Sequence, residues 1–241
     1  MLLLGLDFET TWTEPVDPTR ARITEIGAVL FDWDLGKPIQ LLSTYVWDED
    51  YPKSPDKLVK LTGITDDMLK SMGKSSMTAL IELNALIKKA DYVVAHNGSI
   101  FDKIIYENES SKYGNTVSKP WIDTRIDVDY PEEISTRKLT HLAAEHGFVN
   151  PFAHRALFDA LTMLKLLDHY PIDKVIANSK FPLIHSIAKV SYQDRDLAKA
   201  RGYYWDGENK TWFKPMKENR FEQEEKDAPF VCAKIYPGGY K

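Results

Sequence analysis

The sequence predicts an α/β fold with a mixed central sheet flanked by helices, followed by a small α+β C-terminal module. Three strand patterns separated by short turns open the chain, and helix and strand patterns then alternate as far as residue 169. This order is typical of α/β proteins with a mixed sheet. Pro171 and Pro182 bracket a connecting segment, beyond which a short β-α-β-β pattern follows. We therefore expect a first domain over residues 1–172, a linker over 173–184 and a module over 185–241.

The three leading strands are predicted from apolar runs between turn residues. Residues 2–6 form a short apolar run that is typical of a buried strand, and residues 22–31 form a longer strand pattern. Gly36 and Pro38 mark a turn before the third run, at 41–47. Short turns between successive strands predict an antiparallel meander.

The other elements of the first domain follow from helical periodicity and capping residues. Short helices are expected on either side of segment 61–65, and a longer one begins near Ser75 or Ser76 and runs to about Ala90 with a broad apolar face. The remaining elements are expected in this order: a strand at 92–96, a helix at 100–112, a short strand at 121–123, and helices at 138–146 and 155–169.

Composition places the chain among ordinary globular proteins. It has 241 residues, of which 43% are hydrophobic and 28% charged. No apolar run approaches the length of a membrane span, and residues 1–6 are too short for a signal peptide, so no membrane partner is expected. Cys232 is the only cysteine, so no internal disulfide can form, which fits a reducing, cytoplasmic location. The net charge of −5 argues against a protein that coats nucleic acid nonspecifically.

Two acidic residues stand at the end of the first predicted strand. Because side chains alternate along a strand, Asp7 and Glu9 share one face. Two neighbouring carboxylates at the end of a core strand repel each other and lose water, which is unfavourable without compensation. A divalent cation is the compensation that suits hard oxygen ligands. The alternative is a strand that simply emerges into solvent at Asp7.

Two further carboxylates and a histidine are candidates for the same chemistry. Asp102 stands third after Ser99, a spacing that also fits a capping box at the start of a helix. Asp159 lies in a helix that is apolar nearly all round, where a carboxylate is buried and needs a partner. His154 lies five residues earlier and would not share a helical face with Asp159, so we place it on the preceding loop. A loop histidine can also be merely solvated.

Taken together, these motifs are more specific than any one of them. Asp7-x-Glu9, then His96-Asn97-x-x-x-Phe101-Asp102, then the run from His154 to Asp159 resemble the DEDDh (DnaQ-like) 3′–5′ exonuclease family. Within this family, the sequence is similar to exonuclease X, RNase T and the proofreading subunit of bacterial DNA polymerase III. The segments 23–29, 61–65, 122–124 and 139–143 also fit the family, with Thr62 in place of a usual histidine. The resemblance covers roughly residues 1–169.

The resemblance implies an RNase H-like fold and two divalent ions, Mg²⁺ or Mn²⁺, held by Asp7, Glu9, Asp102 and Asp159. Asp7 would bridge the ions, Glu9 and Asp159 would complete the shell of the first, and Asp102 would hold the second. His154 would be the general base, because the intrinsic pKa of histidine lies near neutral pH. The family also implies four substrate-binding residues, for which turn geometry or core packing is the alternative: Thr10, Thr11, Ile64 and Asn97.

The C-terminal module is less specific. Within it we expect a strand at 184–190, a helix ending near Arg201, two strands paired across the turn at 206–209, and a last strand at 230–236. The run from Arg195 to Phe213 is similar to a short module appended to some DNA-processing proteins. Basic residues interleaved with aromatic ones suit phosphate contacts and base stacking, although so small a module also needs aromatics for its core. The expected DNA contacts are Arg195, Lys199, Arg201, Lys210 and Lys214.

The leading functional hypothesis is a metal-dependent 3′–5′ exodeoxyribonuclease that releases nucleoside 5′-monophosphates from a single-stranded 3′ end, with a role in DNA repair or proofreading. An exoribonuclease of the same family is an alternative, because the motifs do not separate the two sugars. A non-catalytic nucleic-acid-binding adaptor is another, against which the intact set of four carboxylates and a histidine argues. Phosphatases with an Asp-x-Asp strand motif are a distant alternative, because Glu9 replaces the second Asp.

Overall fold

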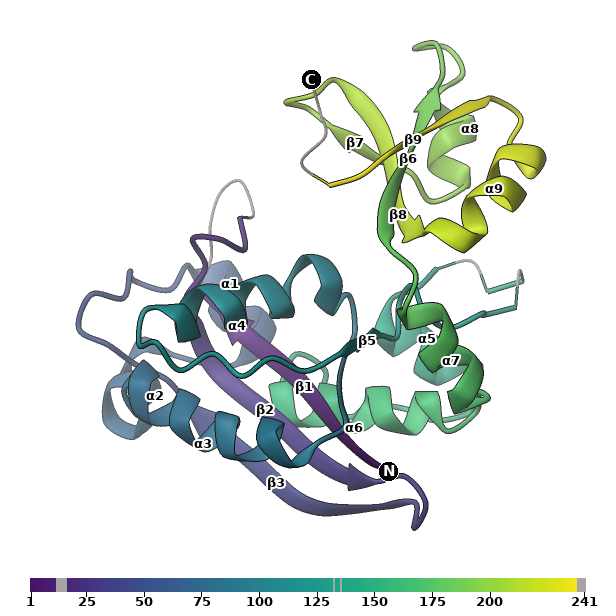
Figure 1. Cartoon of the computed structure of the whole chain (residues 1–241). Coiled ribbons are helices and arrows are strands. Elements are labelled where there is room, and N and C mark those ends of the chain that lie inside the picture. Colours follow the sequence, from purple (N-terminus) through teal and green to yellow (C-terminus); the bar gives the residue numbers. More distant parts are fainter. Residues whose placement is uncertain (12–16, 132, 135, 238–241) are drawn as a thin grey trace. The chain divides into compact units, whose positions relative to one another are not determined.

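The structure is a computed structural model that describes residues 1–11, 17–131, 133–134 and 136–237 (Figure 1). The chain divides into two compact units. The first consists of Met1–Arg125 and Glu132–Pro171, and the second of Ile126–Pro131 and Ile172–Lys241. No helix among the described residues is long and apolar enough to cross a membrane.

A five-stranded mixed sheet, in the order β3-β2-β1-β4-β5, forms the centre of the first unit. β1 (Leu2–Thr10) pairs antiparallel with β2 (Ile23–Asp32), and β2 pairs antiparallel with β3 (Lys37–Tyr45). On its other side β1 runs parallel to β4 (Tyr92–Ala95), which runs parallel to β5 (Trp121–Asp123). The predicted meander and the RNase H-like α/β fold class are therefore confirmed.

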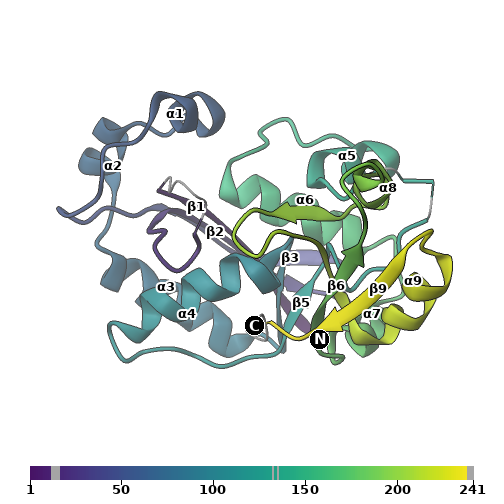
Figure 2. The ribbon, with the colours of Figure 1, turned by 90° about the horizontal axis from the view of Figure 1, so that it is seen from above.

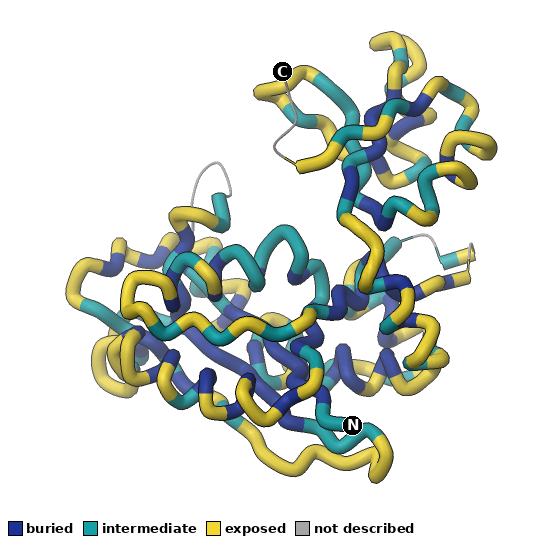
Figure 3. The backbone as a smooth tube through the Cα atoms, in the orientation of Figure 1, coloured by how far each residue is buried: buried dark blue, intermediate teal, exposed yellow. Residues whose placement is uncertain are grey.

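Helices cover both faces of this sheet (Figure 2). On one face, Leu4, Leu6 and Phe8 of β1 form a core with residues of α3 (Ser76–Lys89) and α4 (Asp102–Ser111). On the other face, α6 (Ala156–Leu167) lies against β1 and β2, and α5 (Leu139–Glu145) packs beside α6. Figure 3 shows that β1 and β2 are buried along most of their length. Because residues alternate along β1, Asp7 and Glu9 lie on the α6 face.

Shorter elements connect the sheet and its helices. α1 (Asp56–Thr62) and α2 (Asp66–Met72) flank segment 63–65, as predicted. Thr65 caps α2, and its hydroxyl accepts a hydrogen bond from the backbone N–H of Met68. A short 3₁₀ turn, η1 (Gly98–Ile100), leads from β4 into α4. The capping-box prediction for Ser99 is not what the structure shows, because Phe101 is the cap residue of α4 and the N–H of Ser99 donates to Asp123.

The second unit contains a four-stranded antiparallel sheet in the order β7-β8-β6-β9. Its strands are β6 (Leu183–Lys189), β7 (Tyr204–Asp206), β8 (Thr211–Lys217) and β9 (Val231–Ile235). Its helices are α7 (Ile172–Ser179), α8 (Arg195–Ala200) and α9 (Phe221–Asp227), together with the 3₁₀ turn η2 (Glu218–Arg220). A small core of Ala188, Ala198, Tyr203 and Cys232 confirms the predicted α+β class of the module.

Residues 173–184, expected as a linker, contain a helix in the structure. α7 (Ile172–Ser179) begins directly after Pro171, and it buries Val175 and Asn178. A helix can form here because a proline at its start removes no intrahelical hydrogen bond. Asn178 donates to the backbone carbonyl of Asp127, and Lys217 donates to the carbonyls of Ser179 and Phe181. These bonds connect α7 and the residues after it with Asp127 and with β8 inside the second unit.

Candidate active site

Asp7 and Glu9 project from the C-terminal half of β1, toward the N-terminal turn of α6. Asp7 is partly exposed, and so is Glu9, which lies opposite Glu25 of β2 in the strand register. The pairing of the two strands shifts between Glu9 and Thr10, where β1 ends. The two candidate ligands therefore lie at the edge of the sheet core and remain accessible.

Asp102 is the first residue of α4 and is buried, with 3% of its surface exposed. Its Oδ1 accepts a hydrogen bond of 3.1 Å from the backbone N–H of Phe8, the residue between Asp7 and Glu9. This bond joins the start of α4 to the acidic end of β1. Asp102 is therefore positioned by a hydrogen bond with a residue that lies 94 positions away in the sequence. The local capping motif expected from the sequence does not position it.

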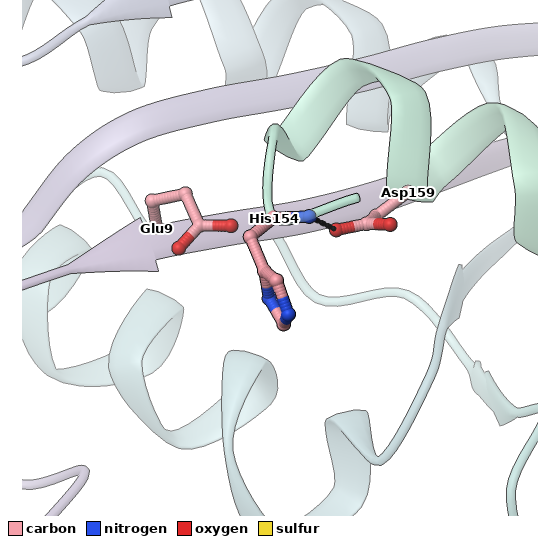
Figure 4. Close-up of side chains that lie close together, drawn as sticks. All are labelled: Glu9, His154 and Asp159. Carbon is pink, nitrogen blue, oxygen red and sulfur yellow. Dashed lines mark hydrogen bonds between the residues drawn. The ribbon is translucent and has the colours of Figure 1, made fainter. Parts of the chain in front are cut away.

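Asp159 and His154 come together at the start of α6 (Figure 4). The carboxylate of Asp159 accepts a hydrogen bond of 2.9 Å from the backbone N–H of His154 and one of 2.6 Å from Nδ2 of Asn150. His154 is exposed and has a φ of 64°, in the left-handed region. It lies on the loop before α6, as predicted. Asn150 was not predicted as a site residue, and its place just before a proline loop was the only sequence signal.

Ligand atoms of three residues gather at this point. One ligand atom each from Glu9, His154 and Asp159 lies within 4.8 Å of the others. Figure 4 shows Glu9 reaching this group from the end of β1, and Asp159 reaching it from α6. Carboxylate oxygens and an imidazole nitrogen at such spacing are a donor set that a divalent cation can occupy.

The pKa values of the four carboxyl groups are raised together. Burial raises the pKa of Asp7 well above its usual range, and the charges of Asp102, Glu9 and Asp159 raise it further. Burial and the charge of Asp159 raise the pKa of Glu9 to about 9. Burial raises the pKa of Asp102 to about 7, although the N–H of Phe8 opposes this. Burial also raises the pKa of Asp159, against the opposing hydrogen bonds from His154 and Asn150.

The charges of Asp102, Glu9 and Asp159 all raise the pKa of Asp7, so the four carboxyl groups lie near one another. The charge of Arg155 lowers the pKa of Glu9 and that of His154 lowers the pKa of Asp159, but the net shift of both groups is still upward. A bound cation lowers the pKa of each ligand and makes the ionised form favourable. The residues therefore fit divalent metal ions both in donor type and in electrostatics.

A second charged pair borders the site. Glu25 of β2 has 1% of its surface exposed, and both Nε and Nη2 of the Arg155 guanidinium group donate hydrogen bonds to its carboxylate. Segment 23–29 was predicted as a strand that fits the family, and neither Glu25 nor Arg155 was predicted as a site residue. The Glu-Ile-Gly sequence in a buried strand was the available signal, since a charged residue there needs a partner.

The four predicted substrate-binding residues have the following positions. Thr10 ends β1 and is partly exposed, whereas Thr11 is buried, with its backbone N–H and its hydroxyl both bonded to Arg22. Ile64 is buried, and its N–H donates to Thr62, whose own hydroxyl donates to a carbonyl of α1. Asn97 has a φ of 69° and donates its N–H to Asp123. Their roles stay predictions.

The five predicted DNA contacts lie in the second unit and differ in their surroundings. Arg201 and Lys214 both form ion pairs with Glu224, which is buried. Arg195 lies over the ring of Tyr192 and donates to its carbonyl oxygen. Lys199 and Lys210 are exposed. The pairing of Arg201 and Lys214 makes them part of the module's own structure, so Lys199 and Lys210 are the simplest candidates.

The fold and the acidic site together define a nuclease of the RNase H-like class. The family described as "Exonuclease" (RNase_T) matches residues 4–167, which is more than half of the chain. The chain therefore belongs to this family, and its motifs are those of the DEDDh 3′–5′ exonucleases. A second family, described as a domain of unknown function (DUF8626), matches residues 186–235. None of the curated protein sequences matches the chain.

Solved structures with the same fold include two nucleases. One is the zinc-bound complex of Escherichia coli exonuclease I with single-stranded DNA, with 17% identity over 82% of this chain and 49% of that chain, at a TM-score of 0.62. The other is the nuclease domain of 3′hExo, a DEDDh family member bound to rAMP, with 20% identity over 70% of this chain and 90% of that chain, at a TM-score of 0.57. The chain spans about half the length of exonuclease I.

Proposed function

We propose that the protein is a metal-dependent 3′–5′ exodeoxyribonuclease that releases nucleoside 5′-monophosphates. The observation that carries the proposal is the convergence of Asp7, Glu9, Asp102 and Asp159, each with a raised pKa, beside His154. A binding adaptor would not need such a cluster, because it costs stability when no cation is present.

Each residue has a separate task in this proposal. Asp7, Glu9 and Asp159 would hold one divalent ion, and Asp7 and Asp102 would hold a second. Two bound Mg²⁺ or Mn²⁺ ions would supply positive charge for the attacking water and for the leaving 3′-oxygen. The imidazole of His154 accepts the proton of that water, and its exposed position on a loop gives it access to substrate. Asn150 and the N–H of His154 keep Asp159 oriented.

DNA is the proposed substrate, and RNA is the alternative. One structural neighbour, exonuclease I, is seen with a dT13 oligonucleotide, and another recognises a histone mRNA stem-loop, so the shared fold accommodates both sugars. We propose that Thr10, Thr11, Ile64 and Asn97 contact the terminal nucleotide. We also propose a cytoplasmic location, in keeping with the free, buried Cys232.

We further propose that the exonuclease domain spans residues 1–172 and that the C-terminal module adds contacts to nucleic acid. We also propose a role in DNA repair or proofreading. Lys199 and Lys210 are exposed. Tyr204 and Trp205 lie between these two lysines in the sequence, and 45% and 53% of their surfaces are exposed. Exposed cations beside exposed aromatic rings suit phosphate contact and base stacking.

The test is degradation of matched single-stranded DNA and RNA oligomers, each labelled at the 5′ end, in Mg²⁺, in Mn²⁺ and in EDTA. The expected result is a ladder that shortens from the 3′ end, with mononucleotide as product, faster on DNA than on RNA and absent in EDTA. Asp7→Asn serves as the inactive control. Equal or faster cleavage of RNA would favour the exoribonuclease alternative, and binding without cleavage would favour the adaptor.

A further inference from the structure

We propose that Glu25 and Arg155 act as a pair of positioning residues that place the start of α6, and with it His154 and Asp159, against the metal-binding end of β1. This inference rests on the proposed exonuclease function. It assigns a role to two residues that neither touch the reacting atoms nor belong to the predicted set of ligands.

The carboxylate of Glu25 has three donors, all of them from the start of α6. Arg155 donates to it from Nε at 3.2 Å and from Nη2 at 2.8 Å, and the backbone N–H of Ala156 donates at 3.1 Å. The first N–H groups of a helix have no partner within the helix. Here a buried carboxylate from a strand supplies that partner, across 131 residues of sequence.

Arg155 has a further contact that fixes its side chain. Its Nη2 donates to the hydroxyl of Tyr45 at 2.8 Å, and its guanidinium lies 5.6 Å from the centre of the Tyr45 ring. Tyr45 ends β3 and lies opposite Glu25 in the strand register. The planar guanidinium group is therefore held by two strands, which suits its fork of donors better than a lysine would.

The neighbouring backbone requires close contact at the same point. Gly27 is the next residue after Glu25 on the same face of β2. A Cβ atom at Gly27 would lie 2.1 Å from backbone atoms of Ala156 and Leu157. The absence of a side chain at Gly27 allows α6 to touch the sheet, and Glu25 fixes where its first turn lies.

Two site residues, His154 and Asp159, depend on this placement of Arg155. His154 immediately precedes Arg155, and its N–H bonds to Asp159 in the first turn of the helix. A displacement at Arg155 therefore moves the general base and a metal ligand together. Misplacement by about 1 Å can reduce a rate on the order of 100-fold.

A different account is that Glu25 acts through its charge alone. Glu25 raises, and Arg155 lowers, the pKa of Glu9. Removing Glu25 would then weaken cation binding, whereas removing Arg155 would strengthen it. The two accounts predict opposite signs for Arg155, which makes them separable.

The test uses the full chain with Glu25→Gln, Arg155→Gln and the double variant. Expected are decreases in kcat of roughly 10- to 100-fold for each single variant, with KM changed less than about threefold. Because the two residues act as one unit, the double variant should lose no more than the worse single variant. Direct Mn²⁺ binding, followed by electron paramagnetic resonance of free Mn²⁺, should weaken in both single variants.

Glu109→Gln is the matched control. Glu109 is also 1% exposed and is ion-paired with Arg22 and Lys112 in the first unit. It should lose thermal stability with kcat nearly unchanged. A loss of kcat in Glu109→Gln as large as that in Glu25→Gln would overturn the proposal, because general destabilisation would then explain both.

Two other results would also overturn it: opposite shifts of Mn²⁺ affinity in Glu25→Gln and Arg155→Gln, or full additivity in the double variant. If Glu25→Gln does not fold, Arg155→Lys carries the test, since it keeps the charge, loses the fork and should fall between wild type and Arg155→Gln. A wild-type chain without nuclease activity would refute the proposed function, while Mn²⁺ binding would still test the positioning.

Discussion

Asp102→Asn should stabilise the metal-free protein above neutral pH. Asp102 is buried, and its pKa is raised to about 7 from 3.8. The folded chain therefore keeps a proton on this group at pH values where the unfolded chain has lost it. Stability without metal then falls as pH rises from about 4 toward 7, and the full cost is present above that range. An amide at this position has no charge and can still accept the N–H of Phe8.

The size of the effect follows from the shift in pKa. About 3 pH units at 1.36 kcal/mol each give a ceiling of roughly 4 kcal/mol. Asp7 and Glu9 share the same repulsion, so part of the cost remains after the substitution, and we expect a gain of about 1–3 kcal/mol. For a domain of this size, that gain corresponds to an increase in Tm of roughly 2–10 °C.

The assay is calorimetric unfolding at pH 8 in EDTA and again in excess Mn²⁺, with the transition of the first unit recognised by its response to Mn²⁺. In EDTA the variant should melt above wild type. In Mn²⁺ wild type should gain more than the variant, because binding to the folded state at 100 times Kd adds about 2.7 kcal/mol. Glu49→Gln, the same loss of charge at an exposed turn, is the control and should shift neither transition. A variant that melts below wild type in EDTA, or a gap between the two that Mn²⁺ leaves unchanged, would refute the electrostatic account of the site.

Other predictions concern activity and binding. Asp7→Asn and Asp159→Asn should each reduce the rate by roughly 10³-fold or more with the fold intact by circular dichroism, and retention of a tenth of the wild-type rate would contradict the metal assignment. His154→Ala should reduce the rate by roughly 10²–10⁴-fold at neutral pH, with a deficit that shrinks as hydroxide rises; a constant deficit from about pH 6.5 to 9 would argue for a structural role. The double substitution Lys199→Gln and Lys210→Gln, made in the inactive Asp7→Asn variant, should reduce by about 2 the slope of log K for DNA binding against log salt concentration. An unchanged slope would show that these lysines do not bind DNA. Gly27→Ala should destabilise the first unit and reduce activity, because its Cβ would push against the start of α6; wild-type Tm and rate would show that the contact is not needed.

Much of the first unit could be predicted because its signals are local. The apolar runs separated by short turns, such as the one at Gly36, predicted three antiparallel strands, and the structure confirms them. The exonuclease family was predicted because Asp7, Glu9, Asp102, His154 and Asp159 stand in a recognisable order, and the family match confirms it. The role of each of these residues in catalysis remains a prediction.

The features that were missed depend on contacts between distant residues. Asp102 is held by Phe8, and Glu25 by Arg155, over separations of 94 and 130 residues that no local pattern reveals. α7 was missed because prolines at both ends of a segment favour a linker, whereas the buried Val175 and Asn178 stabilise a helix there. Two of the five predicted DNA contacts, Arg201 and Lys214, pair with Glu224, which lies 23 and 10 residues away in the sequence.

The short segment Ile126–Pro131 has a consequence for how this protein can be divided or recombined. It groups with the second unit although its sequence neighbours on both sides belong to the first, so the chain passes between the units after residues 125, 131 and 171. Within the second unit, Asp127 is fully buried and pairs with Lys217 at 3.3 Å. A truncation after residue 180 would remove Lys217 and leave a buried acid without this partner. A gene fusion that transplants residues 172–241 alone would likewise lose Asp127, so a stable graft must carry both pieces.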